Sequence, residues 1–170
     1  MKRLFLIRHA KSSWGDQDLD DFKRPLNKRG KQNGPEMAER LAHLSVVPDL
    51  IVASPAKRAK KTATYMAKGT GYPVASIAYH EGLYLGSMAY HLDLLEKSFE
   101  KAKTVFLVGH NYTLTELAEY LTGTSILNVP TCGVVAIEYT DKKGFSNDAG
   151  KGKLLFFDFP KNTSSLRGND

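Results

Sequence analysis

Two histidines and two arginines occur where apolar segments of the sequence end. Arg8 and His9 directly follow "LFLI", His110 follows "TVFLVG", and Arg58 lies shortly after "LIVA". A guanidinium group can hold a phosphate through two hydrogen bonds, and a neutral imidazole can act as a nucleophile or as a hydrogen-bond donor to a phosphoryl oxygen. These residue types favour phosphoryl transfer through a phosphohistidine, provided that the fold brings them together.

The segments between these residues predict the elements that would position them. Apolar runs typical of strands and amphipathic runs typical of helices alternate along most of the chain. We expect strands at 4–7, 50–53, 74–78, 105–108, 134–139 and 154–159, and helices at 28–44, 56–68, 89–101 and 114–122. Asn27 is the expected N-cap of the first helix, and Ser54 with Pro55 would begin the second.

This alternation predicts a single-domain, three-layer α/β/α sandwich. Strands that are apolar throughout belong to a mostly parallel sheet covered on both faces, here of about six strands, and the last two would form a hairpin with an antiparallel edge. Parallel strands present their carboxyl ends at one edge of a sheet, where ligands bind. The two arginines and two histidines are therefore expected to meet there.

Composition sets further bounds. The 170 residues fit one domain at 1–160, followed by a flexible tail at 161–170. The formal net charge of +6 favours an anionic partner. Cys132 is the only cysteine, so no intrachain disulfide can form, and no apolar run approaches the length of a membrane span. We expect a cytoplasmic protein with no membrane partner.

Paired histidines also raise the possibility of a metal site, which Glu81 or His80 would complete. Two arginines nearby would repel a divalent cation, and the sequence contains no H-E-x-x-H spacing. Glycine-rich nucleotide-binding motifs and the G-x-S-x-G motif of serine hydrolases are absent as well. We therefore expect neither a metal nor a cofactor.

Three separate segments resemble the histidine phosphatase superfamily, which includes the cofactor-dependent phosphoglycerate mutases. These segments are "LIRHAKSSW", "SPAKRAKKTA" and "VFLVGHN". Ala10, the following "KSSW" and "DDFKRPLNKRG" resemble the small SixA-type phosphohistidine phosphatase branch. The resemblance extends from about residue 2 to about residue 140. It implies a phosphoglycerate mutase-like fold and a metal-independent phosphatase.

The resemblance also assigns roles. His9 would be the nucleophile that accepts the phosphoryl group, Arg8 and Arg58 would bind its oxygens, and His110 would complete the pocket. Glu81 stands where many relatives have the general acid. Contacts with the substrate or its phosphate are also expected from residues beside the two histidines: Lys11, Ser12 and Asn111.

Other charged and titratable residues receive structural interpretations. Arg24 is expected to pair with Asp20 or Asp21. His43 and His91 lie on expected helical faces, and we interpret both as ordinary surface residues.

Chain length bears on the substrate. The stretch between residues 68 and 105 must supply a strand and a helix, which leaves little for a roof over the pocket. An open pocket suits phosphohistidine on a protein, with inorganic phosphate as the product. Basic runs at 23–31 and 57–61 could attract an acidic phosphoprotein.

Two alternatives stay open. The same chemistry could serve a phosphatase or mutase of small phosphate esters. The chain could also be a non-enzymatic module that binds phosphoproteins or nucleic acid through its basic surface. Nucleic acid is not expected as a partner, because the basic runs lie on helices with hardly an aromatic among them.

Overall fold

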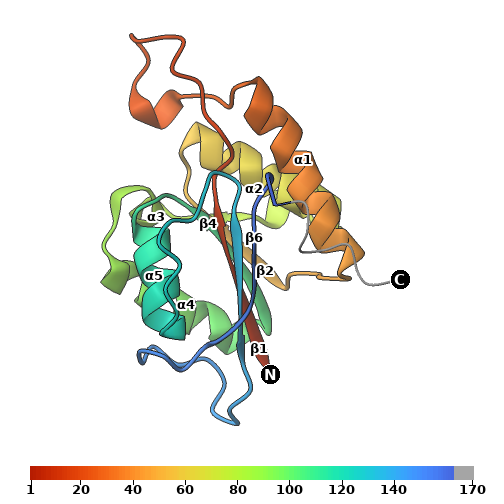
Figure 1. The fold of residues 1–170 in the computed structure, drawn as a ribbon, viewed down its shortest axis with the longest axis vertical. Helices are drawn as coiled ribbons and strands as arrows, with labels where there is room; N and C mark the ends of the chain where they lie inside the picture. Colours follow the sequence, from red (N-terminus) through yellow and green to blue (C-terminus); the bar gives the residue numbers. More distant parts are fainter. Residues whose placement is uncertain (163–170) are drawn as a thin grey trace.

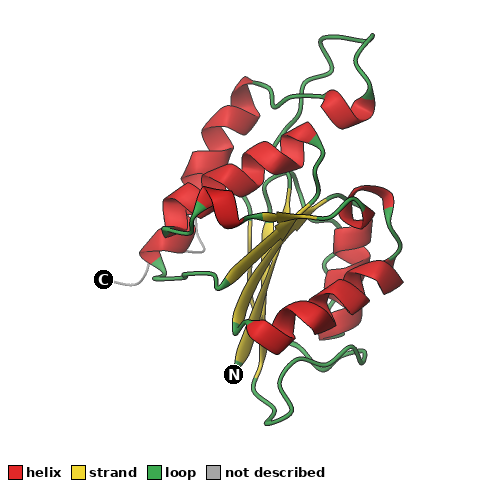
Figure 2. Cartoon of the chain, turned by 180° about the vertical axis from the view of Figure 1, so that it is seen from behind, coloured by secondary structure: helices red, strands yellow, loops and turns green. Residues whose placement is uncertain are grey.

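The computed structural model describes residues 1–162, which form a six-stranded mixed sheet between two layers of helices (Figures 1 and 2). The strand order is β3-β2-β4-β1-β5-β6. The first four strands in this order are parallel neighbours, and β5 runs antiparallel to β1 and β6. The strands are β1 (Lys2–Arg8), β2 (Leu50–Ala53), β3 (Ala78–Tyr79), β4 (Thr104–Gly109), β5 (Val134–Tyr139) and β6 (Lys153–Asp158). The predicted α/β sandwich with an antiparallel hairpin is confirmed.

Each face of the sheet is covered by its own pair of helices. Along β1, Phe5 and Ile7 pack with the helices of one face, whereas Leu4 and Leu6 pack with those of the other. Burial of both faces explains why the central positions of β1, β2 and β4 are apolar on both sides. One layer contains α1 (Lys28–His43) and α2 (Lys57–Thr70), and the other contains α4 (Met88–Lys101) and α5 (Thr113–Thr122).

The register of the central strands aligns the segments that follow them. Arg8 at the end of β1 pairs with Gly109 at the end of β4, and Val108 pairs with Ala53 at the end of β2. The backbone N–H of His9 then donates to the carbonyl of Gly109 at 3.0 Å. The three connections therefore leave the sheet side by side.

Local signals predicted some element boundaries and missed others. The Asn27 side chain accepts a hydrogen bond from the N–H of Gly30 at 2.9 Å, which confirms it as the N-cap of α1. Ser54 is not the N-cap of the next helix, because α2 begins at Lys57 after Ala56. The short helix α3 (Gly82–Leu85) and the 3-10 turn η1 (Asp21–Lys23) were not predicted.

The strand predicted at 74–78 is largely wrong. Residues Val74–Ser76 form a 3-10 turn (η2) after Pro73, and only Ala78 and Tyr79 pair with β2. Proline fixes the backbone angle that begins such a turn, and a segment at the sheet edge has only one neighbouring strand to hold it in an extended conformation.

Of the predicted tail at 161–170, residues 163–170 lie outside the part of the chain that the structure describes. Among those described, no helix is long and apolar enough to cross a bilayer.

Candidate active site

The connections that follow β1, β2 and β4 bring the predicted arginines and histidines into one site. Arg58 lies between the two imidazoles: its Nε is 3.4 Å from His9 Nε2, and its Nη2 is 3.5 Å from His110 Nδ1. The two imidazole centroids are 5.1 Å apart. Arg8, His9 and Arg58 share the wall of a pocket of about 140 Å³. Its other lining residues are Lys11, Ser12, Trp14, Arg24 and Thr131.

Hydrogen bonds on both sides fix the orientation of His9. Its Nδ1 lies 2.7 Å from the carbonyl oxygen of Ala10, so this nitrogen carries the proton. The lone pair is thereby assigned to Nε2, the nitrogen that faces Arg58. The Cys132 N–H donates to the His9 carbonyl at 3.0 Å and fixes the backbone as well. His9 is thus held with an unprotonated nitrogen toward the arginine.

Both imidazoles are kept neutral. The pKa of His9 is lowered to about 3, chiefly by burial, with smaller contributions from His110, Arg58 and Arg8, although the hydrogen bond to the Ala10 carbonyl acts to raise it. Burial followed by the charge of Arg58 lowers the pKa of His110 to about 4. Desolvation penalises the charged form of a buried imidazole, and it is the larger cause here.

Ser54 supports His110 from the end of β2. Its hydroxyl lies 2.7 Å from His110 Nε2 and accepts a hydrogen bond from the Ala56 N–H at 3.2 Å. A hydroxyl can donate as well as accept, so it can satisfy His110 whichever nitrogen carries the proton. The serine that was expected to cap a helix instead positions the second histidine.

The carboxylate of Asp21 forms an ion pair with Arg58. The arginine donates through Nη1 to the Asp21 carbonyl at 2.6 Å and through Nη2 to its Oδ2 at 2.9 Å. Arg24 donates to Oδ1 at 2.8 Å, and Tyr84 donates its hydroxyl to Oδ2. Although partial burial acts to raise the pKa of Asp21, these hydrogen bonds hold it well below its usual range. Asp21 is therefore an anion beside the pocket.

In the pocket wall Arg24 is buried and Arg8 is half-buried, and each has its own hydrogen-bond partners. Arg8 donates through Nη1 to the Val129 carbonyl at 3.0 Å, and its buried Nε has no partner among residues 1–162. Arg24 pairs with Asp21 as one of the two expected acids, and it also donates to the Ser12 hydroxyl. The pocket therefore contains more positive charge than the sequence motifs alone indicated.

The remaining predicted residues differ in where they lie. Lys11 is exposed at the pocket margin, and Ser12 is buried in its wall. Asn111 does not line this pocket. Its amide nitrogen donates to the Asn128 side chain at 2.7 Å, and its amide oxygen accepts from the Thr115 hydroxyl at 2.7 Å. Internal contacts thus occupy Asn111, which secures the loop before β5.

Glu81 is exposed at the residue before α3 and does not line the pocket. Within residues 1–162 its carboxylate has no hydrogen-bond or ion-pair partner. Tyr84, one turn further on, is the residue of this segment that contacts the site, with its ring 5.4 Å from that of His110. A general-acid role for Glu81 stays a prediction.

The interpretation of His91 as a surface residue is wrong. Its ring is 1% exposed, and Nδ1 lies 2.7 Å from the Ser87 carbonyl one turn earlier in α4. His43 is exposed as expected.

Within residues 1–162 there is no group of three or more His, Cys, Asp or Glu side chains placed to hold a metal ion.

No local sequence signal predicts that Asp21 and Tyr84 reach the site. Asp21 reaches Arg58 because the chain after β1 folds back on itself: Ser12 and Leu26 form an antiparallel bridge that closes the loop between them. Tyr84 reaches Asp21 from α3, 63 positions away in the sequence. In the sequence, the acidic pair in "DDFKRP" indicated a carboxylate partner for Arg24 but not one for Arg58.

Comparisons with known proteins agree on the class of this fold. Residues 4–84 match the model of the histidine phosphatase superfamily (branch 1). An uncharacterised chloroplastic protein of Arabidopsis thaliana is 34% identical over 145 residues, which are 81% of this chain and 66% of that protein. The chain therefore spans slightly less than two thirds of the length of this relative.

Solved structures extend the similarity over almost the whole chain. A protein of Agrobacterium tumefaciens assigned as the phosphohistidine phosphatase SixA is 27% identical, with a TM-score of 0.77 over 94% of this chain and 98% of that one. A protein histidine phosphatase SixA complexed with tungstate shares the fold, with 21% identity and a TM-score of 0.79 over 93% and 97% of the two chains. Residues 4–84 are thus similar to the histidine phosphatase superfamily. Within it, the SixA-type proteins are the branch that the chain resembles, and this similarity supports phosphatase activity.

Proposed function

We propose that this protein is a metal-independent phosphatase that acts through a covalent phosphohistidine on His9. The observation that carries the proposal is the unprotonated Nε2 of His9, buried and directed at Arg58 beside Arg8. A neutral imidazole nitrogen is a competent nucleophile, and two guanidinium groups suit the oxygens of a phosphoryl group.

In the first step the His9 Nε2 lone pair forms a bond to phosphorus. The bond from phosphorus to the leaving atom breaks, and its electron pair stays with the leaving group, which takes up a proton from solvent water. Arg8, Arg58 and His110 would stabilise the phosphoryl oxygens. The Ala10 carbonyl, which accepts from Nδ1, would stabilise the positive charge that phosphorylation places on the ring. Water then attacks phosphorus, and cleavage of the P–N bond releases inorganic phosphate and restores His9.

Protein phosphohistidine is the substrate class that the pocket suits best. The carboxyl group closest to Arg58 is that of Asp21, which is held ionised and so is a poor proton donor. An imidazole leaving group is already labile and needs less help from a general acid than an alkoxide does. Similarity to structures described as SixA phosphohistidine phosphatases supports the same substrate class.

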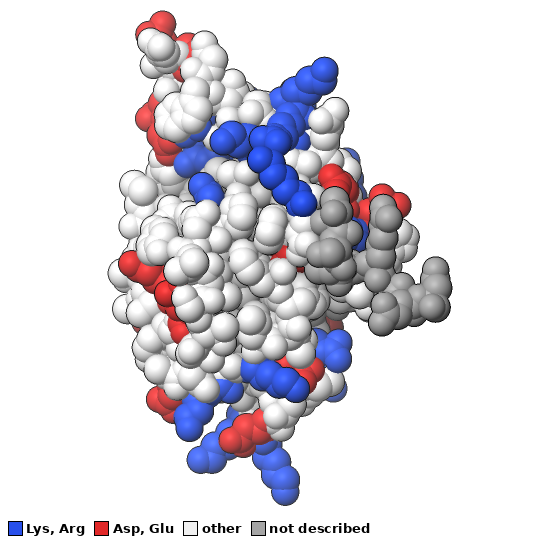
Figure 3. Space-filling model, in the orientation of Figure 1, with Lys and Arg blue, Asp and Glu red and all other residues white. Residues whose placement is uncertain are grey.

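The surface around the site is consistent with a protein substrate. Figure 3 shows Lys and Arg side chains gathering near the top of the view, at the end of the molecule where β1 and β4 finish. α1 and α2 contribute Lys31, Lys57, Lys60 and Lys61 to one hollow beside the site. Such a surface would attract an acidic phosphoprotein before its phosphohistidine enters the pocket.

The test compares His9→Ala with wild type on a histidine-phosphorylated protein and on p-nitrophenyl phosphate. We expect turnover to fall by at least about 10⁴-fold, because the attacking atom is lost. Affinity for inorganic phosphate should stay within about threefold, because Arg8, Arg58 and His110 remain. His43→Ala, at an exposed histidine, is the matched control and should retain full activity.

Appreciable turnover by His9→Ala would overturn the covalent mechanism. A wild-type preference for p-nitrophenyl phosphate over the phosphoprotein would keep the mechanism and move the substrate to small esters. Activity lost in EDTA and restored by a divalent cation would refute metal independence.

A further inference from the structure

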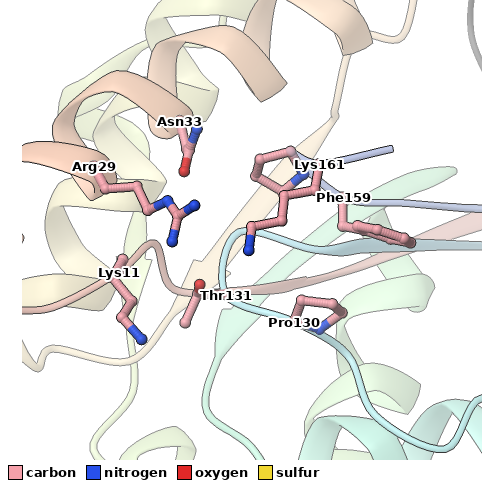
Figure 4. Close-up of a pocket in the computed structure, with 8 residues that line it drawn as sticks. Lys11, Arg29, Asn33, Pro130, Thr131, Phe159 and Lys161 are labelled. Atoms are coloured by element: carbon pink, nitrogen blue, oxygen red, sulfur yellow. The ribbon is translucent and has the colours of Figure 1, made fainter. Parts of the chain in front are cut away.

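A second basic hollow of about 330 Å³ opens beside the reaction pocket (Figure 4). Four separate segments form it: the loop after β1, the first turns of α1, the loop before β5 and the chain after β6. Its polar lining consists of Lys11, Arg29, Asn33, Thr131 and Lys161. Three of these five side chains carry a positive charge, and none of the residues that line the hollow is acidic.

Within the described part of the chain, no acidic side chain neutralises the cations in this hollow. Figure 4 shows the ends of the Arg29 and Lys161 side chains directed toward each other across it, with Thr131 between them and Lys11 at the margin. Within residues 1–162 none of the three has an ion-pair partner, whereas Arg24 and Arg58 in the reaction pocket both pair with Asp21. Cations that face one another repel, and an anion between them removes that repulsion and gains charge-assisted hydrogen bonds.

The hollow adjoins the reaction pocket. Lys11 and Thr131 line both cavities. Cys132, the residue after Thr131, donates its N–H to the His9 carbonyl, and Asn27 at the start of α1 donates its N–H to the Lys11 carbonyl at 3.0 Å. A substrate whose phosphoryl group lies at His9 can therefore extend a neighbouring group into the hollow.

We propose that this hollow is a subsite for a second acidic group of the substrate, supplied by an aspartate or glutamate side chain close to the phosphohistidine. The proposal rests on the phosphohistidine phosphatase function argued above and adds a sequence preference to it. A carboxylate would bind between Arg29 and Lys161. Asn33 and Thr131 add polar surface to the wall.

The first experiment measures kcat/KM on two synthetic phosphohistidine peptides that differ only in carrying flanking Glu or flanking Gln residues. Wild type should prefer the Glu peptide about fivefold, the size that two partly exposed charged contacts give. In Arg29→Gln/Lys161→Gln the preference should fall to about one. Lys97→Gln/Lys101→Gln removes the same charge from α4, which lies on the other face of the sheet, and should retain the preference.

A binding measurement tests the subsite independently of turnover. Titration calorimetry would compare 4-carboxybenzylphosphonate with benzylphosphonate on wild type and on Arg29→Gln/Lys161→Gln. We expect the carboxylate to tighten binding to wild type about fivefold and to have no such effect in the variant. Benzylphosphonate itself should bind both proteins equally.

The outcomes separate the two proposals. Equal binding of the two phosphonates to wild type, or a carboxylate effect that survives in the variant, would overturn the subsite and leave the proposed phosphatase untouched. Turnover of neither phosphopeptide, with p-nitrophenyl phosphate still hydrolysed, would refute the phosphohistidine substrate. A carboxylate effect in the calorimetry would then assign the same subsite to a small ester that carries a carboxylate.

Discussion

The reactivity of His9 depends on one backbone carbonyl. The oxygen of Ala10 accepts from Nδ1 at 2.7 Å, which leaves the lone pair on the nitrogen that faces Arg58. Thr62 keeps this arrangement in place: its hydroxyl accepts from the Ala10 N–H at 2.9 Å and donates to the Arg58 carbonyl at 2.8 Å. A single threonine thus couples the loop of the nucleophile to the helix turn of the arginine.

The lowered pKa values predict how the free site responds to pH. A histidine of ordinary pKa would be only about 3% neutral at pH 5. With the pKa of His9 lowered to about 3 and that of His110 to about 4, both should stay neutral there and gain protons only as the pH falls through 4. The imidazole NMR signals of the free protein, assigned with His9→Asn and His110→Asn, should therefore not titrate between pH 8 and pH 5. Titration of either ring near pH 6.5 would contradict this expectation.

Site residues could be predicted from the sequence where a local pattern, such as a strand end, fixes their position in the fold. Arg8, His9 and His110 directly follow buried strands, so the strand pattern alone brings them to one edge. Asp21 and Tyr84 reach the site only through the path of a folded-back loop and a four-residue helix. Neither path has a periodic signal, because turns of this length are determined by what they pack against.

Among the elements, α1 is fixed most directly to the catalytic loop. A Cβ atom on Gly30, in the first turn of α1, would lie 2.2 Å from the carbonyl oxygen of Lys11. The helix can pack this closely against the loop only because that position has no side chain. The helix and the loop that carries His9 and Lys11 are therefore positioned together.

Gly30→Ala should force that loop to move. We expect the free energy of unfolding to fall by about 1–3 kcal/mol from overpacking, and kcat/KM on p-nitrophenyl phosphate to fall by about tenfold or more. Gly34→Ala is the matched control on the same helix, because its Cβ would overlap the Tyr65 ring instead. It should lose stability while keeping its catalytic rate. Gly30→Ala with wild-type stability and rate would show that the contact is dispensable.

Element types were predicted well where a segment buries a full face and poorly where it does not. The four long helices and the central strands each have a continuous apolar pattern, which burial imposes on them. The segment around Val74 is exposed and pairs over only two residues with β2, so its β-branched composition was not decisive.

Across the whole molecule, the positive charge lies to the sides of the pocket as well as within it. Lys57, Lys60 and Lys61 are exposed on α2, which also carries Arg58. Charges at this distance affect the approach of a large acidic partner more than the chemistry of a small one.

Replacement of Lys57, Lys60 and Lys61 by Gln should therefore lower kcat/KM on an acidic phosphoprotein by about tenfold at low salt. The rate on p-nitrophenyl phosphate should change little, and the difference between variant and wild type should shrink as added salt screens the charges. Stopped-flow or steady-state rates over a range of ionic strength would show this. The same change at Lys97, Lys101 and Lys103 is the control, and an equal loss there would refute local attraction.

The carboxylate of Asp21 also determines which ions the site ignores. The Asp21 carboxylate already accepts from Nη2 of Arg58, and the Asp21 carbonyl accepts from Nη1. An incoming anion must therefore replace an acceptor that Arg58 already has. Chloride or a lone carboxylate brings a single charge and gains little over the group that it displaces. A phosphoryl dianion brings a second charge and more acceptor oxygens, so it alone gains from the exchange. We therefore expect Asp21 to compete with incoming anions and to favour doubly charged ligands over monovalent ones.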